Sequence, residues 1–73
     1  MSAVVARAMR ARAREAVAEH ARAAVADSPL FGREHALAYA LGWCEPSPSA
    51  TDAEVVEQVR GVFEGLRDAG IMT

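Results

Sequence analysis

Apolar and polar side chains alternate with a helical period in three parts of this chain. The most regular pattern covers residues 51–71, where apolar residues recur every three or four positions and charged residues lie between them. On a helix of 3.6 residues per turn, these apolar residues fall on one side. They are Val55, Val56, Val59, Val62, Phe63, Leu66 and Ala69. The pattern predicts an amphipathic helix that buries this side.

Residues at both ends of this stretch indicate where the helix begins and ends. Thr51 followed by Glu54 is the pattern of a capping box, in which each side chain accepts a hydrogen bond from the other residue's backbone N–H. Gly70 suits the left-handed residue that follows a helix, and Ile71 can then fold back onto the last turn. Together they predict a helix over residues 52–69.

Two further helices are predicted upstream. Residues 3–26 are rich in alanine, the residue with the highest helix propensity, and their apolar face consists mostly of small side chains. Ser28 and Pro29 suit the cap and the first position of a second helix over residues 29–41. Residues 44–50 contain two prolines and predict a loop, because proline lacks the backbone N–H that regular structure needs.

The expected fold is therefore a single all-α domain of residues 1–73, a small three-helix domain with a long Ala-rich N-terminal helix. At 1.5 Å per residue the three helices would be roughly 36, 20 and 27 Å long. The expected core combines part of the first helix with large apolar residues of the other two. Those residues are Leu30, Leu37, Leu41, Val55, Val59, Val62, Phe63 and Leu66.

The first predicted helix is longer than either of its partners, so part of its apolar stripe would face water in a monomer. A stripe of alanines also lets a second helix approach closely. We therefore expect the chain to form a homo-oligomer in which two first helices pack together in antiparallel orientation. The residues expected at that contact are Val5, Met9, Ala13, Ala16 and His20.

Residue types narrow the functions that are open to the chain. One cysteine, Cys44, excludes an internal disulfide and suits a reducing cytoplasm, and no apolar run has membrane-spanning length. Cys44 with His20 or His35 lacks the surroundings of a nucleophile and base, and the three lack metal-ligand spacing. No glycine-rich phosphate loop is present. We expect a cytoplasmic protein that is not an enzyme and needs neither cofactor nor metal.

Gly61 and Gly65 fall on the polar flank of the third predicted helix. Glycine in a helix interior costs about 1 kcal/mol relative to alanine. Two interpretations are open, of which we favour the first: they are exposed glycines that the helix tolerates, or they mark a close approach by another element.

Charge is distributed unevenly, although the net charge is only −2. Residues 1–22 hold five arginines and two glutamates (+3), whereas residues 45–73 hold six acids and two arginines (−4). The two ends should attract one another, within a chain or between chains. Arg7, Arg10 and Arg14 line one flank of the first helix. This flank is a solvated face, a contact for the acidic third helix, or a site for nucleic-acid phosphates.

A partial resemblance to a known family bears on the last of these interpretations. The segment Ala36-Leu37-Ala38-Tyr39-Ala40-Leu41-Gly42 resembles the second helix of a helix-turn-helix unit, and residues 55–71 are similar to the third helix of winged-helix regulators. The likeness covers residues 30–73, without the wing, and implies DNA binding with the third helix in the major groove. That helix also carries acids, which would repel phosphates. They are Glu54, Glu57, Glu64 and Asp68.

These patterns favour a small non-enzymatic adaptor or regulator that binds a protein partner and associates with itself. The expected contact lies on the flank of the second helix that points away from its leucines, because aromatic side chains with a polar handle are common interface anchors. It comprises Phe31, His35, Tyr39 and Trp43. Trp43 is equally interpretable as a core residue. The alternative function is a DNA-binding transcriptional regulator of helix-turn-helix type that uses the three N-terminal arginines.

Overall fold

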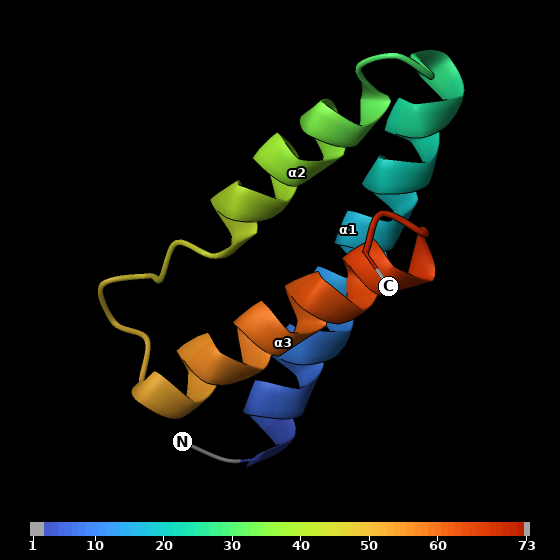
Figure 1. The fold of residues 1–73 in the computed structure, drawn as a ribbon. Coiled ribbons are helices and arrows are strands. Elements are labelled where there is room, and N and C mark those ends of the chain that lie inside the picture. Colours follow the sequence, from blue (N-terminus) through green and yellow to red (C-terminus); the bar gives the residue numbers. More distant parts are fainter. Residues whose placement is uncertain (1–2, 73) are drawn as a thin grey trace.

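The computed structural model describes residues 3–72 and consists of three helices (Figure 1). They are α1 (Ala3–Asp27), α2 (Gly32–Trp43) and α3 (Asp52–Asp68). Between Ala3 and Met72 the chain contains no strand, so the predicted all-α fold with a long N-terminal helix is confirmed. In Figure 1, α2 starts beside the C-terminal end of α1, and α3 crosses the middle of α1.

Helix α2 begins three residues later than predicted, because Ser28 caps a separate turn before it. The Ser28 hydroxyl accepts a hydrogen bond from the Phe31 backbone N–H at 3.3 Å, and the Ser28 carbonyl accepts one from Gly32 at 2.6 Å. Regular helix starts at Gly32 and continues to Trp43, past the predicted end.

Both predicted end structures of α3 are confirmed. The Thr51 hydroxyl accepts from the Glu54 N–H at 3.3 Å, and the Glu54 carboxylate accepts from the Thr51 N–H at 2.8 Å, which completes the capping box. At the other end Gly70 has a φ of +77°, and the Ile71 N–H donates to the Leu66 carbonyl at 2.9 Å. This is a Schellman motif, whose usual apolar contact pairs Ile71 with Leu66, and both side chains are buried.

The favoured interpretation of Gly61 and Gly65 as exposed glycines is wrong, since both are buried where α1 crosses α3. A Cβ atom on Gly61 would collide with the Arg10 carbonyl of α1, and one on Gly65 would lie 2.6 Å from the Arg14 carbonyl. The missing side chains therefore let the two backbones approach closely.

The core is made mainly of small side chains. Its buried apolar residues are Ala13, Val17, Ala18, Ala21, Ala36, Ala40, Val62, Leu66 and Ile71. Val17 and Val62 are the largest side chains that are fully buried among residues 3–72. A core of this kind follows from the close approach of the helices, since there is little room between them for larger groups.

The predicted core is therefore wrong for half of its members. Leu30 is 75% exposed, Leu41 69%, Phe63 46% and Leu37 37%, while Val55 and Val59 are half-buried. Only Val62 and Leu66 lie in the interior as predicted. For Leu37 and Leu41 the reason is the rotation of α2, which buries its alanines and turns these leucines outwards. Helix α2 packs more extensively on α1 than on α3.

Candidate protein-binding surface

An apolar groove opens between α2 and α3. It encloses about 300 Å³, and all its lining side chains are apolar or a thiol. They are Leu37, Ala40, Leu41, Cys44, Val62, Phe63, Leu66 and Met72. We call this surface the α2–α3 groove. Four of its residues, Leu37, Leu41, Phe63 and Met72, are at the same time large and exposed.

Helical spacing explains the shape of the groove. The four residues from α2 and its C-terminal cap follow i, i+3, i+4, i+7 spacing, so they form one row facing α3. Within each helix one neighbour is buried and the other protrudes: Ala40 lies in the floor beside Leu41, and Val62 lies in the floor beside Phe63. The Gly70 turn brings Met72 back to the same groove.

The arginine flank of α1 is largely engaged by α3. Arg10 donates to both carboxylate oxygens of Glu64, from Nε at 2.8 Å and from Nη2 at 2.6 Å, and reaches Glu57 at 3.2 Å. Arg14 likewise holds Asp68 through two hydrogen bonds, at 2.6 and 3.0 Å. These side-chain hydrogen bonds hold the pKa of Glu64 and of Asp68 below their ordinary values.

Of the three arginines in the predicted phosphate-binding flank, two therefore contact the acidic third helix, as one of the interpretations proposed. Arg7 is exposed and lines a shallow hollow beside Arg10 and Arg14. The acids of α3 face α1. The opposite flank of α3, next to the groove, carries two arginines and two large apolar residues. By helical register this row is Val56, Arg60, Phe63 and Arg67. Arg60 donates to Glu57 at 2.7 Å.

The four aromatic-face residues predicted for protein binding do not form one exposed cluster. Tyr39 and Trp43 are half-buried and pack against the core, and the Tyr39 ring stacks on His20 at 3.8 Å between centroids. Phe31 and His35 are exposed. The buried side of α2 consists of Ala36 and Ala40 with Tyr39 and Trp43 beside them, whereas Leu37 and Leu41 meet solvent.

The stripe predicted for self-association is partly covered within the chain itself. Ala13 is fully buried, and Met9 and Ala16 are half-buried. Val5 and His20 are exposed. An antiparallel contact between two α1 helices would need Ala13 at its centre, and α2 and α3 already pack on this side of α1.

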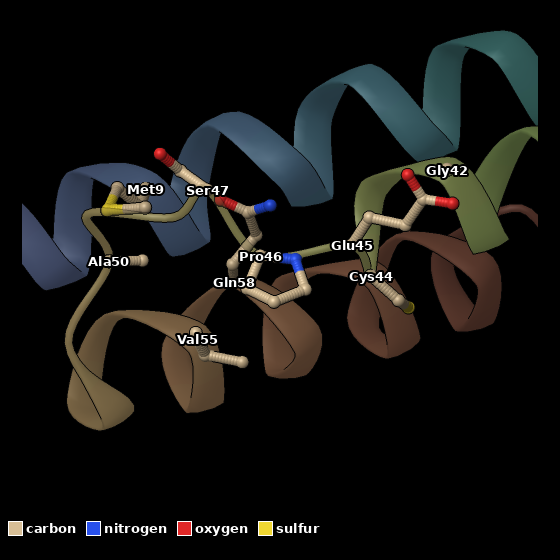
Figure 2. Close-up of a pocket in the computed structure, with 9 residues that line it drawn as sticks. All are labelled: Met9, Gly42, Cys44, Glu45, Pro46, Ser47, Ala50, Val55 and Gln58. Atoms are coloured by element: carbon tan, nitrogen blue, oxygen red, sulfur yellow. The ribbon is translucent and has the colours of Figure 1, made fainter.

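A second hollow, of about 320 Å³, lies under the loop that joins α2 to α3 (Figure 2). It contains both polar and apolar groups, including Met9, Glu45, Ser47 and Gln58. The Gln58 amide donates to the Trp43 carbonyl at 2.7 Å and so ties the C-terminal end of α2 to α3. Figure 2 shows the Cys44 side chain directed towards α3, where it also lines the α2–α3 groove.

The described residues hold no group of three histidine, cysteine or acidic side chains that could bind a metal ion. No helix among them combines the length and the apolar character that crossing a membrane requires. Comparison with models of known protein families, with curated proteins and with solved structures gave no match to this chain. Any functional conclusion therefore depends on the chemistry of the surface.

Proposed function

We propose that this chain is a protein-binding module, a small non-enzymatic adaptor or regulator, and that its binding surface is the α2–α3 groove. One observation carries the proposal. The chain buries alanines and valines while Leu37, Leu41, Phe63 and Met72 stand exposed around a single hollow. Scattered exposed apolar residues are ordinary, but a contiguous apolar patch is typical of an interaction site.

The groove also has the form that recurs in helix recognition. Two helices flank an apolar trough, which accepts side chains spaced at i, i+3, i+4 and i+7 on a partner helix. Burying Leu41 and Phe63 would remove large apolar surfaces from water at about 25 cal/mol per Å². Arg60 and Arg67 border the trough and would contact the polar edge of the partner.

A matched pair of substitutions tests this proposal. Leu41→Glu places a charge in the groove, and Val4→Glu places one at a site of nearly equal exposure, 66% against 69%, near the start of α1. We expect the Leu41→Glu variant to lose proteins that copurify with the parent chain, and the Val4→Glu variant to retain them. Circular dichroism checks that both remain helical. Retention of every partner by Leu41→Glu would contradict the proposal.

A DNA-binding regulator is the second candidate, and one observation favours it. The acids Glu57, Glu64 and Asp68 lie in ion pairs, so they repel phosphates less than the sequence suggests. The same pairs, however, occupy Arg10 and Arg14. Binding to random duplex DNA that weakens steeply with salt would support this candidate, because phosphate contacts release counterions. Absence of binding at low salt would remove it.

A further inference from the structure

We infer that the occupant of the α2–α3 groove is a second copy of this chain, held in a two-fold symmetric contact. The inference rests on the proposed protein-binding function of the groove and names its partner. It replaces the contact between two α1 helices that the sequence suggested.

The first argument is the incomplete burial of the single chain. Its accessible surface is 4863 Å². A compact monomer of 7.8 kDa would expose roughly 4,400 Å². The radius of gyration, 12.5 Å, likewise exceeds the roughly 11 Å expected for 73 residues. The excess surface accompanies a core made mainly of small side chains and a groove lined by larger ones. A second chain over the groove would supply the missing part of the core.

The second argument is the shape of the groove. In a two-fold contact the same patch meets itself, so the patch must carry both a protrusion and a hollow to receive it. Leu41 protrudes at the rim, directly beside the floor formed by Ala40, Val62 and Leu66. The Leu41 side chain of each copy can therefore enter the hollow of the other. A flat or purely concave surface would not have this self-complementarity.

The third argument is the charge along the two rims. The outer row of α2 begins with a glutamate. By helical register it consists of Glu34, Leu37 and Leu41. The outer row of α3 has two arginines that flank Phe63, namely Arg60 and Arg67. If α2 of one copy packs on α3 of the other, Glu34 meets an arginine beside the leucines and Phe63. Arg33 is the single arginine or lysine of α2, and it does not belong to this outer row.

The required area is also present. A standard interface covers about 800 Å² per partner, which is about a sixth of the surface of this chain. The molecule measures 41 × 20 × 17 Å, so one broad face that includes both rows and the groove can supply that area.

Sedimentation equilibrium of the whole chain tests the inference. We expect the parent chain to sediment at about twice its mass of 7.8 kDa at micromolar concentrations. Leu41→Glu should raise the dimer dissociation constant at least about thirtyfold, the loss typical of a hot-spot anchor. Val4→Glu should leave it within a factor of two or so, as expected of a site outside the interface. A monomeric parent chain, or a Leu41→Glu dimer as tight as the Val4→Glu dimer, would overturn the inference.

Photocrosslinking separates this inference from the proposed function. A benzoylphenylalanine placed at position 41 reacts on illumination with whatever occupies the groove, in the cells from which the chain comes. An adduct of two copies supports both proposals. An adduct that contains only another protein overturns the second copy as occupant but leaves the protein-binding function standing. Absence of any protein adduct contradicts both.

Discussion

Arg10 of α1 and Glu64 of α3, 54 residues apart in the sequence, form a two-pronged ion pair with N–O distances of 2.8 and 2.6 Å. The same pattern recurs one turn further on, between Arg14 and Asp68. The basic start of the chain and its acidic end are thus joined within one molecule. Gly61 lies against the backbone of Arg10 and Gly65 against that of Arg14, so the two helix backbones approach closely beside these pairs.

The first prediction concerns the acid stability that these ion pairs confer. The pKa values of Glu64 and Asp68 lie below their ordinary values of 4.5 and 3.8, chiefly because Arg10 and Arg14 hydrogen-bond to the charged forms. A carboxylate whose pKa is lower in the folded state contributes stability above its unfolded pKa, and this contribution is lost as the pH falls through the folded value. We expect the melting temperature to fall as the pH drops below about 4.5, the ordinary value for Glu64.

The control for this prediction is the double variant Glu64→Gln and Asp68→Asn, which removes both charges and keeps the size of the side chains. It should melt at a lower temperature than the parent at neutral pH and lose less stability on acidification. Thermal denaturation followed by circular dichroism gives both values. An equal loss in parent and variant would mean that other carboxylates cause the acid sensitivity.

The second prediction concerns the glycine at the helix crossing. Gly61→Ala adds a methyl group that collides with the Arg10 carbonyl, and overpacking of this kind costs typically 1–3 kcal/mol. Gly42→Ala, in the last turn of α2, meets nothing within 4 Å. That substitution should stabilise the chain by up to about 1 kcal/mol through helix propensity. Urea denaturation measures both changes, and a Gly61→Ala variant as stable as Gly42→Ala would contradict the crossing.

The third prediction compares two leucines of the groove. Leu66 is 3% exposed, so Leu66→Ala should destabilise the single chain by about 2–5 kcal/mol. Leu41 is largely exposed, so Leu41→Ala should change the stability of the single chain by less than about 0.5 kcal/mol. Denaturation at concentrations low enough to keep the chain monomeric measures each effect. Similar losses for both would place Leu41 in the interior after all.

The sequence predicts the helices well because their ends depend on neighbouring residues. Thr51 and Glu54 need only each other to form the capping box, and Gly70 adopts its positive φ without help from distant parts of the chain. The start of α2 was misplaced because Ser28 caps either a helix or a single turn, and the residues on either side do not distinguish the two.

The buried face of α2 could not be predicted in the same way. Helical spacing alone offers two candidate faces, one with Leu37 and Leu41 and one with Ala36 and Ala40. Burial of the larger apolar area favours the leucines, so the sequence predicts the wrong face. Which face of α2 is buried depends instead on how closely α2 approaches α1. At the start of α2, Gly32 has no Cβ and so leaves room for the α1 backbone at Ala24 and Val25. The sequence therefore predicts Leu37, Leu41 and Phe63 as core residues, whereas the structure exposes them around the groove.

The last prediction concerns Trp43, which the sequence left open between core and interface. The structure places it half-buried against the core, with its carbonyl held by the Gln58 amide at 2.7 Å. Truncating a buried tryptophan costs about 3–5 kcal/mol, so Trp43→Ala should cost roughly half of that and lower the melting temperature of the single chain. Phe31→Ala is the control, because Phe31 is 56% exposed and makes no contribution to the core cluster. Its melting temperature should stay close to that of the parent. An unchanged melting temperature in Trp43→Ala, together with a loss of partner binding, would instead make Trp43 an interface anchor and extend the binding surface beyond the α2–α3 groove.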